Sequence, residues 1–195
     1  MTILFATNND HKLSEIRSMI PPAIVLRSLA DINYPNDIPE TGNTLEENAM
    51  IKARTIYNIT NLPTFADDTG LEIECLNGEP GVRSARYAGE NKNMDDNIRK
   101  VHRLMENETN RNARFRTVIA LIINGEEFLF EGIISGTIIR EKRGNSGFGY
   151  DPIFIPHRKT LTFAEMSPVE KNSISHRSEA LSKLVTFLSS RSDIQ

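Results

Sequence analysis

The feature that most constrains the fold of this chain is a pair of long strand-like segments in its second half. Residues 113–123 and 127–139 are rich in β-branched and aromatic residues, which favour extended backbone. The two segments meet at Asn124-Gly125, a dipeptide that favours the tight turn of a β-hairpin. An antiparallel ribbon of this length predicts one elongated sheet.

Helical and extended patterns alternate through the rest of the chain. Apolar residues at helical spacing predict helices from the polar turn 7–10 to Ile20, from Thr44 to about Thr60, around 98–105 and around 181–188. Thr44 and Glu47 have the spacing of a capping box. Short strands are expected at 2–6, 64–66, 71–75 and 153–155. We therefore expect one packed domain over residues 1–195, of α/β or α+β architecture around a mixed sheet.

Composition excludes several classes of protein. The net charge is −3 and a quarter of the 195 residues are charged, so a basic surface that grips nucleic acid is not expected. Cys75 is the only cysteine, which excludes an internal disulfide and a thiolate-rich zinc site. No apolar run approaches the roughly 18–20 residues that a membrane span requires, and no charged leader precedes the first strand. These features predict a soluble, unprocessed, cytoplasmic protein.

Two lysines stand where an anion could bind. A buried strand leads into the polar segment Thr7 to His11, and Lys12 follows at the start of a helix. The unpaired N–H groups and the positive end of the dipole at a helix start are suited to binding phosphate. A capped helix with a solvated Lys12 is the alternative, and the segment is neither a Walker nor a Rossmann loop. Lys52 projects from within the apolar arc of its helix, so its ammonium either reaches water along its stem or lies beside an anion.

An acidic pair marks a candidate metal site. Asp67 and Asp68 are expected on a turn, 67–70, between two short strands, and Glu40 could supply another oxygen from a different loop. Carboxylate oxygens so placed are what Mg²⁺ prefers, since it usually keeps several waters and shares substrate phosphates. An Asx-turn is the common structural role of such a pair. Asp67 is either a second metal ligand or a supporting acceptor.

Two further segments could recognise a nucleobase. Glycines on both sides of Phe148 free its ring to stand out and stack, and Asp151 could accept hydrogen bonds from a base, although Phe148 could equally pack in the core. The polar segment 170–177 is expected to enter the last helix with Ser175 as its N-cap, as an anion or base-edge site or merely a solvated helix start.

Together these segments resemble the inosine triphosphate pyrophosphatase family, whose members remove deaminated purine nucleotides. The resemblance rests on five stretches in the same order along most of the chain: TNNDHK, ETGNTLEENAMIKA, FADDTGLEIECLNGEPGVRSARYAG, SGFGYDPIF and FAEMSPVEKNSISHR. The chain departs from many members at Asn8, where they have glycine, and at Thr69, where they have serine. Asparagine tolerates left-handed backbone and threonine keeps the hydroxyl, so neither change removes the resemblance.

The resemblance implies a two-lobed α/β fold with a long central mixed sheet, a nucleotide cleft between the lobes and a homodimer. It also implies Mg²⁺-dependent hydrolysis of ITP, dITP or XTP to the monophosphate and pyrophosphate. Glu40 and Asp68 would hold the metal, and Asp68 would deprotonate the water that attacks the α-phosphorus. The residues implied to bind the substrate are Thr7, Asn8, Asn9, Asp10, His11, Lys12, Lys52, Thr69, Phe148, Gly149, Tyr150, Asp151, Lys171, His176 and Arg177.

Base selectivity would follow from hydrogen bonding. Inosine and xanthine present a 6-oxo group and a ring N1–H, whereas adenine presents a 6-amino group, so donors at that position leave ATP with mismatched partners. A pyrophosphatase for another nucleotide and a nucleotide-binding module without hydrolysis are the alternatives. An RNA-binding protein would suit the aromatics of residues 146–150, but the chain lacks a basic stripe.

Overall fold

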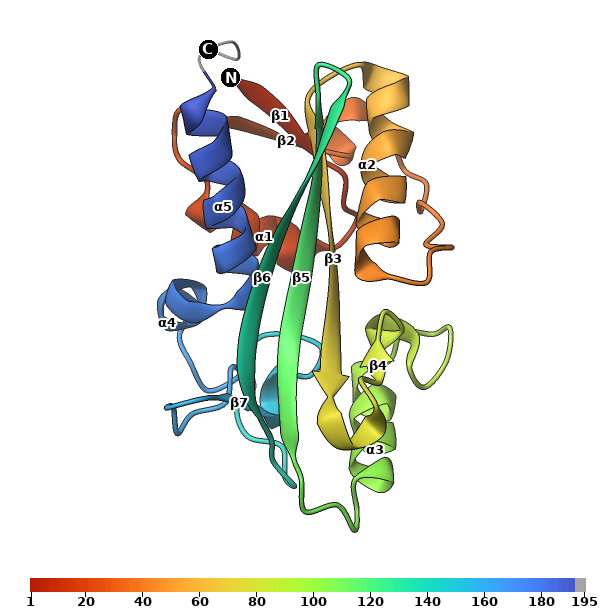
Figure 1. Ribbon diagram of the computed structural model, residues 1–195, viewed down its shortest axis with the longest axis vertical. Coiled ribbons are helices and arrows are strands. Elements are labelled where there is room, and N and C mark those ends of the chain that lie inside the picture. Colours follow the sequence, from red (N-terminus) through yellow and green to blue (C-terminus); the bar gives the residue numbers. More distant parts are fainter. Residues whose placement is uncertain (192–195) are drawn as a thin grey trace. The chain divides into compact units, whose positions relative to one another are not determined.

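The computed structural model describes residues 1–191, whose strands form a seven-stranded sheet in the order β2-β1-β3-β5-β6-β7, with β4 paired to β3 (Figure 1). The strands are β1 Thr2–Phe5, β2 Val25–Ser28, β3 Thr64–Ile73, β4 Pro80–Gly81, β5 Asn112–Ile123, β6 Glu126–Ile138 and β7 Phe154–Pro156. The helices are α1 Asp10–Met19, α2 Leu45–Thr60, α3 Met94–Leu104, α4 Pro168–Ile174 and α5 His176–Ser190. Parallel pairs (β1 with β2 and β3) and antiparallel pairs (β3 with β4, β6 with β7) make the sheet mixed, as expected.

The chain divides into two compact units. Unit 1 comprises residues 1–68, 117–132 and the chain from Arg177 onward, and unit 2 comprises residues 69–116 and 133–176. Three strands, β3, β5 and β6, contribute residues to both units. The two-lobed α/β fold is thus confirmed, whereas the single catalytic domain and the nucleotide cleft stay predictions.

Unit 1 is a parallel β2-β1-β3 sheet, extended by β5 and β6, with helices on both faces. Ile3 and Phe5 of β1 pack with Ile16 of α1 and Leu184 of α5 in one buried cluster. The intervening Leu4 faces the other way, because successive side chains of a strand alternate. Figure 1 shows α2 on that second face, and the buried apolar residues of this helix are Leu45, Ala49, Ala53 and Ile56.

The helical connections of unit 1 lie on different faces of its sheet. The β1–α1–β2 connection covers one face and the β2–α2–β3 connection the other, so the chain changes sides between β1 and β3. In open α/β sheets, ligands bind outside the carboxyl ends of the strands at such a switch point. The topology therefore predicts a ligand site at the residues that follow β1 and at their neighbours on β3.

Unit 2 has its own aromatic core. Phe115 of β5 packs edge-on to Phe154 of β7 with ring centroids 4.7 Å apart, and both rings contact Phe163. Ile98 and Val101, on one face of α3, complete this cluster. The apolar residues whose spacing predicted this helix thus form its buried face.

Most predicted elements are confirmed. The hairpin turns at Asn124 and Gly125, whose φ angles of 52° and 80° place both in the left-handed region that favours these residues. Thr44 caps α2 by accepting a hydrogen bond from the Glu47 N–H at 3.1 Å. The second half of the expected capping box differs, because the Glu47 carboxylate accepts from the N–H of Asn43 rather than of Thr44.

Two expectations about local structure were wrong. Residues 67–70 do not form a turn but lie within the continuous strand β3, because the carboxylates of Asp67 and Asp68 find cationic partners and Gly70 allows close approach of β4. The segment 170–177 does not simply enter the last helix. Residues 168–174 form the separate helix α4, capped by Ser167 and Glu170 through a capping box, and Ser175 stands between α4 and α5.

We predict that Thr44→Ala lowers the free energy of unfolding by about 1 kcal/mol, because it removes the side chain that caps α2. Thr44→Ser keeps the hydroxyl and should retain most of that stability. Chemical denaturation of the three proteins measures the difference. Equal stability of the alanine and serine variants would show that the cap contributes nothing.

Candidate functional site

The segment after β1 leads directly into α1. The Asn9 side chain caps this helix by accepting from the N–H of Lys12 at 3.1 Å, and the Asn9 N–H donates to the hydroxyl of Thr7. The register that pairs Phe5 with Phe65 places the residues after β1 beside the acidic pair of β3. The carboxyl end of β1 and the middle of β3 therefore share one site.

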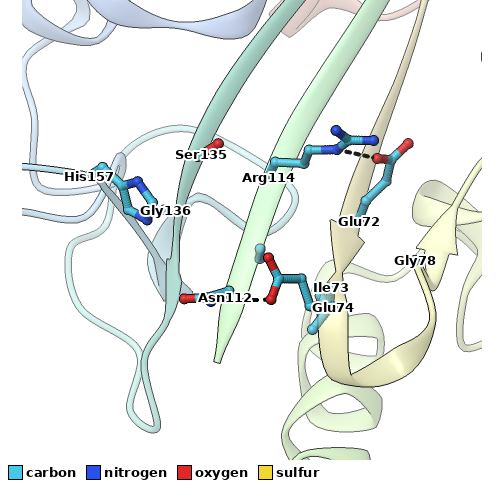
Figure 2. Close-up of a pocket in the computed structure, with 10 residues that line it drawn as sticks. Glu72, Ile73, Glu74, Gly78, Asn112, Arg114, Ser135, Gly136 and His157 are labelled. Atoms are coloured by element: carbon cyan, nitrogen blue, oxygen red, sulfur yellow. Dashed lines mark hydrogen bonds and ion pairs between the residues drawn. The ribbon is translucent and has the colours of Figure 1, made fainter. Parts of the chain in front are cut away.

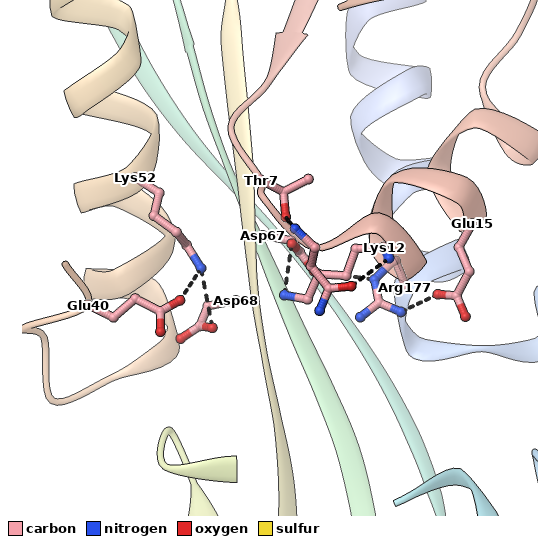
Figure 3. Close-up of polar contacts among 9 residues, drawn as sticks. Thr7, Lys12, Glu15, Glu40, Lys52, Asp67, Asp68 and Arg177 are labelled. Carbon is pink, nitrogen blue, oxygen red and sulfur yellow. Dashed lines mark hydrogen bonds and ion pairs between the residues drawn. The ribbon is translucent and has the colours of Figure 1, made fainter. Parts of the chain in front are cut away.

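The two aspartates of β3 project to opposite faces of the strand (Figure 3). Asp67 points towards α1 and α5, where it meets Lys12, and Asp68 points towards α2, where it meets Lys52. Alternation along a strand requires this separation of neighbouring residues. The acidic pair is thus divided between two clusters.

On the face of α1 and α5, four charged side chains alternate in sign. The Lys12 ammonium lies 3.0 Å from Oδ1 of Asp67, and Nε of Arg177 lies 3.3 Å from Oδ2 of the same carboxylate. The Arg177 guanidinium also pairs with Glu15 of α1. Arg177 and Asp67 are each only 1 % exposed. Lys12 is therefore held by a buried partner, which contradicts the alternative of a solvated Lys12.

On the face of α2, Lys52 joins two carboxylates. Its Nζ lies 2.7 Å from Oε1 of Glu40 and 3.5 Å from Oδ1 of Asp68. The loop that carries Glu40 is held against α2 because the amide of Asn48 accepts from the N–H of Gly42 at 2.8 Å. A Cβ at Gly42 would come within 2.5 Å of Glu47, so glycine is required for this approach. Of the two alternatives for Lys52, the structure therefore shows the one in which its ammonium lies beside anionic groups.

The pKa values of the two aspartates move in opposite directions. Burial alone would raise the pKa of Asp67, but Lys12 and Arg177 outweigh burial and hold it well below its ordinary value. Burial also raises the pKa of Asp68, and there Lys52 offsets only part of the effect. Neighbouring carboxyls with divergent pKa values are typical of a divided task, in which one stays ionised and the other exchanges a proton.

The face of α2 fits a divalent cation. Oδ2 of Asp68 is buried and has no hydrogen-bond partner in the part of the chain that the structure describes, which is costly for a carboxylate oxygen. Glu40 supplies a second carboxylate nearby. Within residues 1–191, no group of three or more His, Cys, Asp or Glu side chains is arranged to hold a metal. An ion here would need oxygens from water or substrate, as is usual for Mg²⁺.

The remaining residues of the predicted phosphate segment are exposed. The amide of Asn8 donates to the carbonyl of Asn36 at 2.9 Å and to Asp37 at 3.2 Å, which ties this segment to the loop before Glu40. Asp10 and His11 begin α1 on its exposed side.

In unit 2, the predicted base-binding residues fall into one polar cluster. Oδ2 of Asp151 accepts from Nζ of Lys171 at 2.7 Å and from the N–H of Phe148 at 2.9 Å. Gly147 has a φ of 77°, and a Cβ there would lie 2.2 Å from that oxygen. Lys171 lies 4.9 Å from the centre of the Phe148 ring, which is half-buried. Asp151 therefore shapes the loop that presents Phe148.

The other predicted residues of unit 2 lie in more varied surroundings. Tyr150 belongs to the core, and its hydroxyl donates to the carbonyl of Ser84 at 2.8 Å. The buried ring of His176 stacks on Phe115 at 4.8 Å. Thr69 and Gly149 are half-buried. The structure thus gathers Phe148, Asp151 and Lys171 but leaves Tyr150 with a packing role.

A separate hollow of about 360 Å³ lies in unit 2 (Figure 2). Two lining residues, Arg114 and Glu72, pair at 2.6 Å, and the lining residue Glu74 accepts hydrogen bonds from the amides of Asn110 and Asn112. Its carboxylates are thus engaged by neighbouring side chains. None of the residues predicted for catalysis or substrate binding lines it.

Two residues of the site were missed from the sequence. Glu15 lies one helical turn after Lys12, and Asn48 lies one turn before Lys52 on the buried face of α2. Glu15 is three residues after Lys12, and Asn48 is four residues before Lys52, so each shares a helix face with a lysine predicted to bind the substrate. This spacing is the sequence signal that could have identified both residues.

Comparison with known proteins agrees with this geometry. Residues 3–187 match the Ham1 family. The chain is 52 % identical over 187 residues to a protein of Flavobacterium psychrophilum named dITP/XTP pyrophosphatase, covering 96 % of this chain and 98 % of the relative. It is 46 % identical to a Bacillus subtilis protein of the same name, with 95 % and 96 % covered.

Solved structures give the same result. The Ham1 protein of Staphylococcus aureus superposes with a TM-score of 0.89 at 40 % identity, covering 97 % of this chain and 99 % of that one. A structure from Mycobacterium abscessus, described as a nucleoside-triphosphatase or dITP/XTP pyrophosphatase, gives 0.77 at 40 % identity, covering 95 % and 99 %. Matches of this extent in sequence and fold show that the chain belongs to the Ham1 family.

Proposed function

We propose that this protein hydrolyses non-canonical purine nucleoside triphosphates, namely ITP, dITP and XTP, to the monophosphate and pyrophosphate. The observation that carries the proposal is the division of Asp67 and Asp68 between two lysine clusters at the switch point of the parallel sheet. The names of the relatives support the choice of substrate. The enzyme is a hydrolase of acid anhydrides that clears such nucleotides from the pool.

Lys12 and Lys52 would neutralise the leaving pyrophosphate from opposite faces of β3. The first turn of α1 adds N–H groups and the positive end of its dipole beside Lys12. Phosphoryl transfer needs little covalent chemistry from a protein, so positioning and charge account for most of the rate. The geometry of the two lysines suits that task.

Asp68 would accept the proton of the attacking water. In the absence of a metal, burial raises the pKa of this carboxyl, which is the direction that favours a general base. Asp67 would stay ionised, because Lys12 and Arg177 stabilise its charge, and would serve as a support for these cations. Of the two roles open to Asp67, the structure favours the supporting acceptor over the metal ligand.

We propose that the cofactor is Mg²⁺, held by Glu40 and Asp68. Four carboxylates face three cationic side chains in the two clusters, so a bound triphosphate would meet an excess of negative charge. When bound, Mg²⁺ supplies compensating charge and lowers the pKa of bound water. The buried Oδ2 of Asp68 is the ligand atom that fits it best.

Base recognition in unit 2 remains a prediction from the family. Phe148 would stack on the purine. Asp151, Lys171, His176 and Arg177 would fix its polar edge and the nearby phosphates or ribose. We also propose a homodimer located in the cytoplasm. Among residues 1–191, no helix combines the length and the apolar character that crossing a membrane requires.

The first measurement is pyrophosphate release from ITP, XTP, dITP, GTP, ATP and dTTP, with and without Mg²⁺. We expect ITP, dITP and XTP to react roughly 10⁴-fold faster than ATP, because mismatched polar groups at the 6-position are costly. Chelation should abolish release. Equal rates for all six would contradict the base-recognition account, and no release from any would favour a binding module.

Asp68→Asn should lower kcat by about 10²- to 10⁴-fold, the contribution typical of a general base. The amide keeps the shape and removes a charge that burial disfavours, so the free energy of unfolding should not fall. Single-turnover kinetics and chemical denaturation test both expectations. A kcat of Asp68→Asn close to that of the wild type would show that Asp68 is not the general base.

Glu40→Gln should weaken the binding of Mg²⁺ in the presence of pyrophosphate by at least about tenfold, the scale seen for residues that merely support a ligand. Titration calorimetry measures this without turnover. Glu127→Gln is the matched control, because Glu127 pairs with Arg54 at an exposed site. Unchanged affinity in Glu40→Gln would remove Glu40 from the metal site.

A further inference from the structure

Glu15 is a charged residue that neither the motifs nor the proposed chemistry uses, and it is joined to the site. Its carboxylate pairs with Arg177, which donates through Nε to Oδ2 of Asp67 at 3.3 Å. The other oxygen of Asp67 accepts from Lys12 at 3.0 Å. One continuous chain of contacts thus runs from Glu15 to the ammonium of Lys12 (Figure 3).

This chain is shielded from water along most of its length. The side chains of Arg177 and Asp67 are 1 % exposed, that of Lys12 is 13 % exposed and that of Glu15 is 16 % exposed. In such surroundings a charge interacts more strongly than at the surface, and removing one partner leaves an uncompensated charge behind. Glu15 is therefore unlike the exposed ion pairs of the protein, such as Arg54 with Glu127.

The effect of Glu15 on Lys12 follows from the order of charges in this chain of contacts, which alternates between negative and positive. Arg177 is shared between two carboxylates, so each holds only part of its guanidinium. Without Glu15, Arg177 would turn more fully to Asp67 and compete with Lys12 for that carboxylate. The position of the Lys12 ammonium would then be less well defined.

We propose that Glu15 is a positioning residue, which acts through Arg177 and Asp67 to hold the ammonium of Lys12 where the leaving pyrophosphate is neutralised. This inference rests on the proposed function for its role in turnover. Small displacements of a charged group relative to a transferring phosphoryl group are costly, because catalysis there depends on placement.

The experiment is a double-mutant cycle between Glu15→Gln and Lys12→Met, with Glu127→Gln as the matched control. The affinity for pyrophosphate by calorimetry and kcat for ITP are both measured. Glu15→Gln should lower each by about tenfold, within the coupling found for residues of one network. In the Lys12→Met background the same change should have little further effect, and Glu127→Gln should leave both values unchanged.

Chemical denaturation separates positioning from folding, since a merely structural role would lower stability without coupling to Lys12. An equal loss of pyrophosphate affinity from Glu15→Gln in both backgrounds would overturn the inference, as would no loss in either. Pyrophosphate binding does not require turnover. A wild-type protein that binds pyrophosphate but hydrolyses no triphosphate would overturn the proposed function alone.

Discussion

Successive residues of a β-strand project to opposite faces, and the candidate site depends on this constraint. Asp67 and Asp68 are adjacent in the chain, yet one meets Lys12 and Arg177 while the other meets Lys52 and Glu40. A turn at this place could have turned both carboxylates to the same side. The strand keeps them apart, so two carboxyls with different surroundings lie within one candidate site.

Burial of so many charges is tolerated because each finds a partner. A lone buried carboxylate or ammonium is strongly destabilising, whereas a paired one with additional hydrogen bonds is not. Arg177 is the clearest case, since Asp67 and Glu15 together raise the pKa of its guanidinium against the effect of burial. The buried Oδ2 of Asp68 is the exception among the described residues, and it is the atom on which the proposal of a bound Mg²⁺ rests.

The parallel order β2-β1-β3 explains why these charges meet at the end of β1. With α1 on one face and α2 on the other, the lysine of each helix approaches β3 from its own side. Lys12 comes from the first turn of α1 and Lys52 from the buried face of α2. The site is therefore a product of topology, with helix capping by Asn9 and Thr44 fixing where each helix begins.

The sequence by itself determined the alternation of helices and strands, the hairpin at Asn124-Gly125 and the residue types of the site, because periodicity, turn chemistry and charge are local properties. It also indicated that Lys52 lies in an apolar arc, which the buried position of that residue confirms. The separate helix 168–174 also has a local signal, the capping box of Ser167 and Glu170. The sequence did not determine that Asp67 and Asp68 lie in a strand or that Glu15 reaches the site through Arg177. Those features depend on partners between 16 and 162 positions away along the chain, and only tertiary structure brings such partners together.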